Sequence, residues 1–189
     1  MVLHEGEVLR QASERPALVV PCEAIGMYRS AADYSSACLV GVHSGVRSDA
    51  ADFQASVDSF SALNEHGMGP LGFIMLVVDE GDHIPPAPFR RQFAELRKRG
   101  RPHRLAFISQ SAIARGVITA IDWLQPPRAD QQVKAWTTVS EGVEWLELEH
   151  GAPLSALMAL YASARRAGAG ARSDSRSMAK PSPDALPKK

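Results

Sequence analysis

The sequence has little that would build a disulfide scaffold, a metal site or a membrane anchor. Cys22 and Cys38 are its only cysteines, and their spacing is not that of metal ligands. Two isolated cysteines are typical of free thiols in a reducing compartment. No apolar run approaches the roughly 20 residues that cross a bilayer, and residues 1–15 lack the apolar core of a signal peptide. We therefore expect a cytoplasmic protein with no membrane span.

Familiar catalytic patterns are missing as well. The sequence has no Gly-x-Ser-x-Gly motif, and its six histidines are scattered without ligand spacing. The glycine-rich segment 67–72 precedes a strand pattern and has no Lys-Ser/Thr after it, so it does not have the context of a phosphate-binding loop. We expect no catalytic residues, no metal and no cofactor.

Charge is balanced overall but unevenly distributed. Residues 165–189 carry seven basic and two acidic side chains, whereas residues 1–164 carry 14 basic and 19 acidic ones. Residues 168–189 offer only Met178 and Leu186 as large apolar groups. Burying such a side chain returns about 1.5–3 kcal/mol, and ordering each residue costs about 1–2 kcal/mol. We predict a disordered basic tail over 167–189, a poorly ordered segment over 1–15, and one folded domain over 16–166.

The most apolar run, residues 71–78, is framed by glycine, proline and acidic turn residues. A run this short with turn signals at both ends predicts a strand buried on both faces, as in parallel sheets covered by helices. Shorter strands are predicted at 25–29, 38–42, 104–108 and 133–137, with a connecting turn at 31–36. Helical patterns alternate with the later strands, which predicts a single α/β domain of repeated strand–helix units with a mainly parallel sheet.

Apolar spacing also predicts which helix residues face the core. A first helix is expected after Ser48 and Asp49. In the four helices that follow it, the residues expected to face the core are, helix by helix, Phe89, Phe93 and Leu96; Ile113, Val117, Ile121 and Leu124; Val143 and Leu146; and Leu154, Leu157, Met158 and Tyr161.

One phrase of the sequence resembles a known family. Residues 138–146 read Thr-Val-Ser-Glu-Gly-Val-Glu-Trp-Leu, and the preceding helical segment 111–124 has small residues and a central glycine. With the order of elements over 24–148, this resembles the STAS domain, the anti-sigma-factor antagonists and lipid-binding-like relatives. The resemblance implies a compact sheet with strands in near-sequential order and a non-catalytic regulatory or protein-interaction module. In the antagonists a serine after the central strand is phosphorylated, but the matching segment 79–86 has no serine.

Two other functions stay open. Relatives of this fold carry small apolar or lipid ligands, which would need a cavity between sheet and helices. An enzyme would have its best candidates in Asp79, Asp82 and His83.

The candidate contacts with a ligand or partner follow the predicted strands. Ligands of open α/β sheets bind at the carboxyl ends of strands, where the candidates are Asp79, Glu80, Asp82, His83, Ser109 and Ser111. These groups could hold a cation or contact a basic partner, although a solvated turn explains the acidic run equally well.

A basic surface is expected on the helix after the central strand, from Arg90, Arg91, Arg97, Lys98 and Arg101. It could attract phosphate or an acidic partner, and an ordinary solvated helix face is the alternative. No aromatic residues alternate with these charges, so stacking on nucleic acid is not expected. We expect the partner to be another protein.

Overall fold

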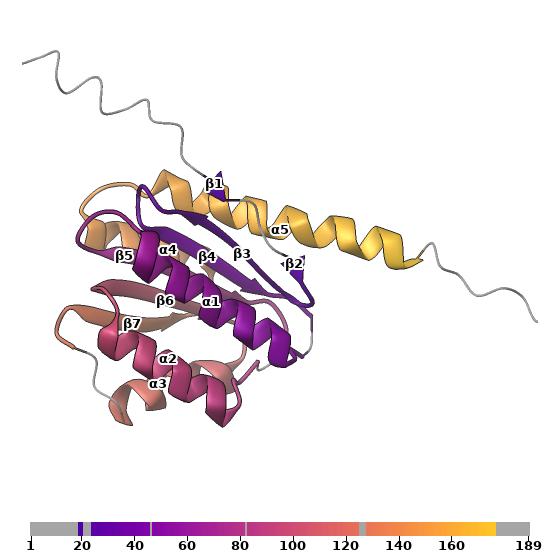
Figure 1. The fold of residues 1–189 in the computed structure, drawn as a ribbon, viewed down its shortest axis with the longest axis horizontal. Helices are drawn as coiled ribbons and strands as arrows, with labels where there is room; N and C mark the ends of the chain where they lie inside the picture. The colour runs from indigo at the N-terminus through magenta and orange to yellow at the C-terminus, as the bar shows by residue number, and fades with distance from the viewer. Residues whose placement is uncertain (1–18, 21–23, 46, 82, 125–127, 177–189) are drawn as a thin grey trace, which may run out of the picture.

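The computed structural model describes residues 19–20, 24–45, 47–81, 83–124 and 128–176. The predictions for residues 1–15, for Asp82 and for residues 177–189 lie outside this part of the chain. The described residues form an α/β fold with helices on both faces of one sheet (Figure 1). In chain order the elements are β1 (Val19–Val20), β2 (Ala24–Ile25), β3 (Tyr28–Asp33), β4 (Cys38–His43), α1 (Ala50–His66), β5 (Gly72–Val78), α2 (Ala87–Arg99), β6 (His103–Ser109), α3 (Ala112–Leu124), β7 (Gln131–Trp136), α4 (Val139–His150) and α5 (Ser155–Arg176).

The sheet has the order β1-β3-β4-β5-β6-β7, with β2 also paired to β3. β3 runs antiparallel to β4, and the strands from β4 to β7 are parallel. The prediction of parallel strand–helix units is confirmed for this part of the sheet. β5 lies at the centre and is buried on both faces, as its apolar sequence predicted.

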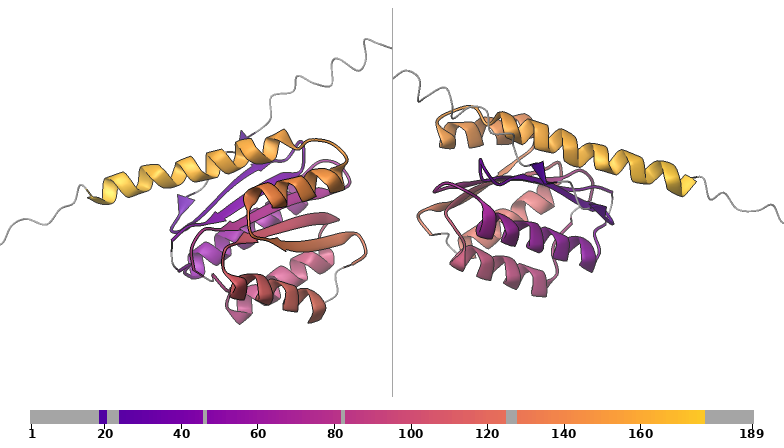
Figure 2. Two further views of the ribbon diagram at one scale, coloured as in Figure 1. Left: turned by 180° about the vertical axis from the view of Figure 1, so that it is seen from behind. Right: turned by 45° about the horizontal axis from the view of Figure 1, so that its top comes forward.

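The helices form two layers (Figure 2). α4 and α5 cover one face, while α1 and α3 cover the other and α2 packs on α1. On the first face Met75 of β5 packs in one core cluster with Leu146 of α4 and Leu157 of α5, all three with 0% exposure. On the second face Ile74 of β5 packs with Phe60 of α1. The strands from β4 to β6 are therefore enclosed between apolar helix faces, which is the main source of folding free energy.

Local sequence signals explain where α4 begins, ends and rests on the sheet. Thr138 and Glu141 form a capping box, in which each side chain accepts a hydrogen bond from the other's backbone N–H. Gly151 ends the helix in a left-handed conformation, with φ 77°. A Cβ at Gly142 would lie 2.8 Å from Cδ1 of Ile108 on β6, so glycine lets α4 approach the sheet closely without moving the Ile108 side chain. The glycine of the 138–146 phrase therefore has a packing role.

Two predictions at the amino-terminal side were wrong. The expected single strand at 25–29 is two strands, because Gly26 turns the chain with φ 56° between β2 and β3. The expected turn at 31–36 belongs in its first half to β3, which continues to Asp33 and pairs with β4. β3 pairs with β4 on one side and with β1 and β2 on the other, so its backbone is hydrogen-bonded although its sequence is polar.

Three helix faces also differ from the apolar spacing. On α3, Ile113 is 63% exposed and Ala114 is buried in its place, whereas Val117 lines the apolar cavity as predicted. The side chains of Ile121 and Leu124 lie outside the described part of the chain. Near α5, Leu154 and Leu157 are buried as predicted, whereas Met158 is 48% exposed and Leu160 is buried instead, where α5 lies along β3 and β4. The stripe on α2 is only half-buried, and no residue of α2 is fully buried, since this helix packs on α1 instead of directly on the sheet.

The last helix is longer than predicted. Its backbone is helical to Arg176, nine residues beyond position 167 where a disordered tail was expected to begin. Composition alone underestimated it, because alanine favours helix strongly and needs no burial to do so.

Candidate functional site

The carboxyl ends of three parallel strands meet at one edge of the sheet. His43, the last residue of β4, is paired in register with Val78 of β5, and Val78 is paired with Ser109 of β6. The loop from β4 to α1 and the loop from β5 to α2 therefore leave the sheet side by side. The predicted contact residues all follow these strands.

Most of those residues do not converge on one point. The carboxylate of Asp79 forms an ion pair with Arg165 of α5, and Glu80 is exposed. Asp82 lies outside the described residues. Asp79 and His83 are engaged with different partners, so the described geometry does not assemble them into one catalytic or metal centre.

Ser109 and Ser111 have structural roles at the start of α3. The Ser109 hydroxyl accepts a hydrogen bond from the backbone N–H of Ser111 (3.1 Å). The Ser111 hydroxyl accepts one from the backbone N–H of Ala114 (3.1 Å), which is the pattern of a helix cap. Ser111 is therefore the N-cap of α3.

His83 turns back from the second loop to the first. Its Nε2 lies 2.7 Å from the carbonyl oxygen of Gly45, and its Nδ1 lies 2.6 Å from Oγ of Ser48. Ser48 Oγ also lies 2.8 Å from Nδ1 of His43. We call His43, Ser48 and His83 the histidine–serine cluster. It joins the two loops at the carboxyl ends of β4 and β5.

The directions of these hydrogen bonds follow from the Gly45 carbonyl, which can only accept. Nε2 of His83 must donate to it, so Nδ1 of a neutral His83 is an acceptor. The Ser48 hydroxyl then donates to His83, and its oxygen accepts from Nδ1–H of His43. The serine proton therefore lies toward His83.

His43 is enclosed by aromatic rings. It is 3% exposed, and its ring centroid lies 4.7 Å from that of Tyr28 and 5.7 Å from that of Phe53. Burial and, to a smaller extent, the nearby His83 lower the pKa of His43 to about 4, against the opposing effect of Asp52. His43 is thus a neutral hydrogen-bond donor at pH 7.

The buried carboxylate of Asp52 stabilises the backbone next to the histidine–serine cluster. Asp52 is 1% exposed and accepts hydrogen bonds from the backbone N–H groups of Met27 (2.7 Å), Tyr28 (2.9 Å) and Asp49 (2.9 Å). These bonds fix the β2–β3 turn against the beginning of α1. A Cβ at Gly26 would lie 2.6 Å from Oδ1 of Asp52, so the turn requires glycine here.

From the sequence alone His43 was one of several scattered histidines, and Ser48 and Asp49 were the residues that precede the first predicted helix. Asp49 is the N-cap of α1, and Ser48 lies one residue earlier. The signal that could have found the cluster was positional. Two histidines at the ends of consecutive strands approach each other when those strands are parallel neighbours.

The predicted basic residues divide into two groups. Arg90, Arg91, Arg97 and Lys98 occupy one side of α2, at positions i, i+1, i+7 and i+8. Arg101 instead donates to the carbonyl oxygens of Gly69 and of Leu63, and so ties the exit of α1 to the exit of α2. Arg101 is therefore half-buried and structural, and the basic surface is confined to α2.

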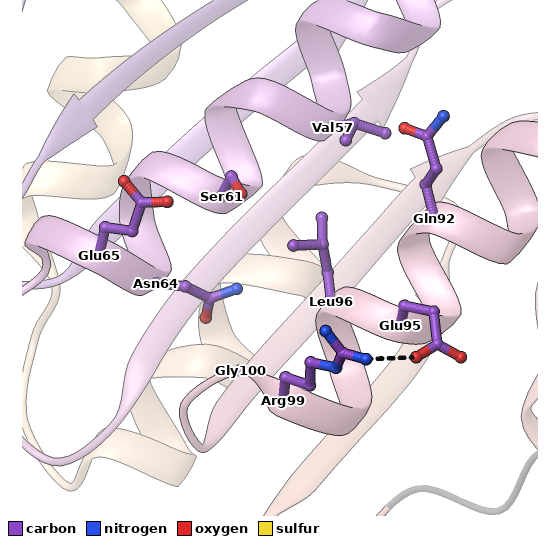
Figure 3. Close-up of a pocket in the computed structure, with 9 residues that line it drawn as sticks. All are labelled: Val57, Ser61, Asn64, Glu65, Gln92, Glu95, Leu96, Arg99 and Gly100. Carbon is purple, nitrogen blue, oxygen red and sulfur yellow. Dashed lines mark ion pairs between the residues drawn. The ribbon is translucent and has the colours of Figure 1, made fainter.

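In the described part of the chain, three of the spaces beside these elements bear on a binding function. An apolar cavity of about 40 Å³ borders the rings of His43 and His83 and is lined by residues of α1, α2 and α3. A groove of about 360 Å³ separates α1 from α2 (Figure 3), with Val57 and Leu96 facing each other and Glu95 paired with Arg99 at 3.9 Å. A third depression, of about 480 Å³, lies at the opposite edge of the sheet beside Leu71.

The pair of Asp79 with Arg165 should contribute little to stability. Arg165 is 47% and Asp79 21% exposed, and exposed pairs are worth about 0.2–1 kcal/mol. A double-mutant cycle with Asp79→Ala and Arg165→Ala, measured by urea unfolding, should give a coupling free energy in that range. A coupling above about 2 kcal/mol would contradict this assignment and would make the pair an essential link between α5 and the site.

Comparisons of this chain with models of protein families, with curated proteins and with solved structures find no match. Among the described residues, no group of three or more His, Cys, Asp or Glu side chains is arranged to bind a metal ion. No helix in the described part of the chain combines the length and apolarity that crossing a membrane requires.

Proposed function

We propose that this protein is a regulatory or protein-interaction module built like a STAS domain and acting in the cytoplasm. The observation that supports the proposal is the strand order. From β3 to β7 the order of the strands in the sheet is the same as their order in the chain, and helices lie over both faces of the sheet. This is the arrangement that the resemblance of residues 24–148 implies.

The binding face that we propose lies at the carboxyl edge of the sheet. Ile84 is 39% exposed and Ile113 is 63% exposed, although both are large apolar side chains. They belong to neighbouring parts of the fold, because Ile84 lines the same small cavity as Ala114, the residue after Ile113. Exposed apolar side chains of this size are typical of contact points for partners.

Charge beside these residues specifies the kind of partner. Arg90 donates to the carbonyl oxygen of Pro85 (2.7 Å), which places its positive charge next to Ile84, and Arg91 is exposed on the same side of α2. An apolar centre with a basic rim matches a protein surface with an apolar patch and an acidic rim. The partner proposed is therefore an acidic protein.

The test is a pull-down from native lysate with the full chain and two variants that introduce acidic groups. Ile113→Glu and the double variant Arg90→Glu/Arg91→Glu should each reduce recovery of the partner at least tenfold. The first places a charge against the partner's apolar patch, and the second places acidic groups against its acidic rim. Leu148→Glu is the matched control, since Leu148 is an even more exposed apolar residue (79%) on the opposite helix layer.

The outcome with Leu148→Glu decides where the partner binds. A protein that binds the wild type and the Leu148 variant, and not the other two, supports the proposed face. Loss of binding only in the Leu148 variant would move the interface to α4. If no protein is enriched specifically by the wild type, the proposal of an interaction module fails.

The alternative function, a carrier of a small apolar or lipid ligand, is less well supported. The apolar cavity between sheet and helices measures about 40 Å³, whereas pockets for organic ligands measure about 300–1,000 Å³. The two larger spaces are open grooves with polar residues among their lining.

A further inference from the structure

We propose that Ser48 is an activated nucleophile that accepts a short acyl group from an activated ester, with His83 as its general base. The proposed reaction is a single acylation of Ser48 and not repeated catalysis, so it is compatible with a regulatory module. It rests on the histidine–serine cluster alone and does not depend on the STAS-like function or on the proposed partner face.

The first argument is the arrangement of the base. An activated serine needs a base within about 2.6–3.2 Å that is oriented in turn by a third group. Ser48 Oγ lies 2.6 Å from Nδ1 of His83, and the Gly45 carbonyl, 2.7 Å from Nε2, holds the ring in the tautomer that can accept the serine proton.

The second argument is the backbone of His83. Its φ is +36°, a left-handed conformation that a non-glycine residue adopts at a cost. The two hydrogen bonds of the ring hold the residue in this conformation. Backbone strain of this kind is concentrated at functional sites, although Ala37 in the β3–β4 turn also has a positive φ, of 51°.

The third argument is the surroundings of Ser48 Oγ. The oxygen has two lone pairs, and one of them accepts from His43, whose burial keeps it neutral and fixed as a donor. A donor at this position stabilises negative charge on the oxygen as its proton leaves. Ser48 also precedes the N-cap Asp49, so the positive end of the α1 dipole lies beside it. The second lone pair is the one that attacks, and Ser48 is only half-buried.

The step balances without any further reactant. Ser48 Oγ attacks the ester carbonyl carbon while its proton moves to Nδ1 of His83. The bond from that carbon to the leaving oxygen then breaks, and the leaving alcohol takes the proton from His83. The products are acylated Ser48 and the free alcohol. The cavity beside the two rings measures only about 40 Å³, which favours an acetyl group over a long chain.

The experiment uses the full chain with 4-nitrophenyl acetate and, separately, with an alkyl fluorophosphonate, whose serine adduct is stable after fluoride leaves. Intact mass followed by peptide mapping should place one adduct on Ser48. Ser44 provides an internal control, because it lies in the same loop and its Oγ donates to the Met27 carbonyl instead of to a histidine. Mapping on the wild type identifies the reactive side chain without any variant.

His83→Gln then tests the role of the base. It should slow modification of Ser48 by about 10²-fold or more, the size of a general-base contribution. Ser44→Ala should leave the rate unchanged. Unmodified Ser48 with both reagents would overturn the proposal, and so would an equal rate in folded His83→Gln. A variant that fails to fold, judged by circular dichroism, is replaced by His83→Asn for the same comparison.

Discussion

Replacement of Asp52 by alanine should lower the free energy of unfolding by about 3–5 kcal/mol. The carboxylate accepts from the backbone N–H groups of Met27, Tyr28 and Asp49, in a site where the side chain is 1% exposed. Each buried donor left without an acceptor costs about 1–3 kcal/mol. The loss is a large fraction of the 5–15 kcal/mol that is typical of a whole domain. Urea unfolding followed by circular dichroism measures it.

Two further variants make the test specific. Asp52→Asn keeps an oxygen for Met27 and Tyr28 and loses the charge, so its effect should be about half as large. Asp58→Ala is the control on the same helix, because Asp58 is exposed and accepts only from Gln54 (2.8 Å). It should change stability by less than about 0.5 kcal/mol. If Asp52→Ala costs under 1 kcal/mol, the carboxylate does not hold the β2–β3 turn to α1.

Stability should fall steeply as the pH is lowered from 7 to 5, because of two buried histidines. Burial lowers the pKa of His43 to about 4, with His83 and Asp52 facing the ring. Burial lowers the pKa of His103 to about 4 as well, where the carbonyl of Arg101 accepts from Nδ1–H and Arg97, Arg104 and Asp130 are the nearby charges. Both rings stay neutral in the folded protein at pH 5.

The sign follows from proton uptake. An unfolded histidine has a pKa near 6.5, so between pH 6.5 and about 4 the unfolded chain binds protons that the folded chain does not. Above pH 6.5 both states are neutral and the effect vanishes. Each histidine then removes up to about 1.4 kcal/mol per pH unit, or about 2 kcal/mol by pH 5. Together they should remove about 3–4 kcal/mol, measured by urea unfolding at each pH.

Asparagine substitutions separate the two contributions. The amide nitrogen of asparagine takes roughly the place of Nδ1, the atom that both rings use as a donor. His43→Asn and His103→Asn should each remove about half of the stability change between pH 7 and 5, whatever their effect at pH 7. His66→Asn, at an exposed ring (63%), should leave the change intact. An unaltered pH dependence in the double variant would show that other groups cause it.

Sequence patterns predicted an element correctly where the residue types of the segment match its burial in the fold. β5 has large apolar residues on both faces, and its neighbours enclose it on both faces. α1 begins after Ser48 and Asp49, as predicted, and Asp49 is its N-cap. The second half of β3 was missed because its sequence ends at Asp33, which resembles a turn residue, yet Asp33 is buried. Its carboxylate accepts a hydrogen bond from the Ser35 hydroxyl, a partner that cannot be identified before the hairpin is known.

The candidate site was predictable in its position and not in its composition. The carboxyl edge of the sheet follows from the alternation of strands and helices, and His83 was expected there. His43 and Ser48 are joined to it by the register of β4 against β5, which no local pattern encodes. The acidic run at 79–82 is conspicuous in the sequence because its charges are adjacent. The side chains of the histidine–serine cluster are few and far apart in sequence.

The position of α5 has a consequence for how the protein is made. During synthesis each strand from β3 to β7 emerges next to the strand with which it pairs, so the sheet can grow in the order of translation. α5, however, lies on β3 and β4, the long strands that leave the ribosome first. One face of those two strands stays uncovered until the last described helix has been translated. A nascent chain therefore cannot bury Val40 and its apolar neighbours on this face until α5 has been made, which makes these strands prone to aggregation during synthesis.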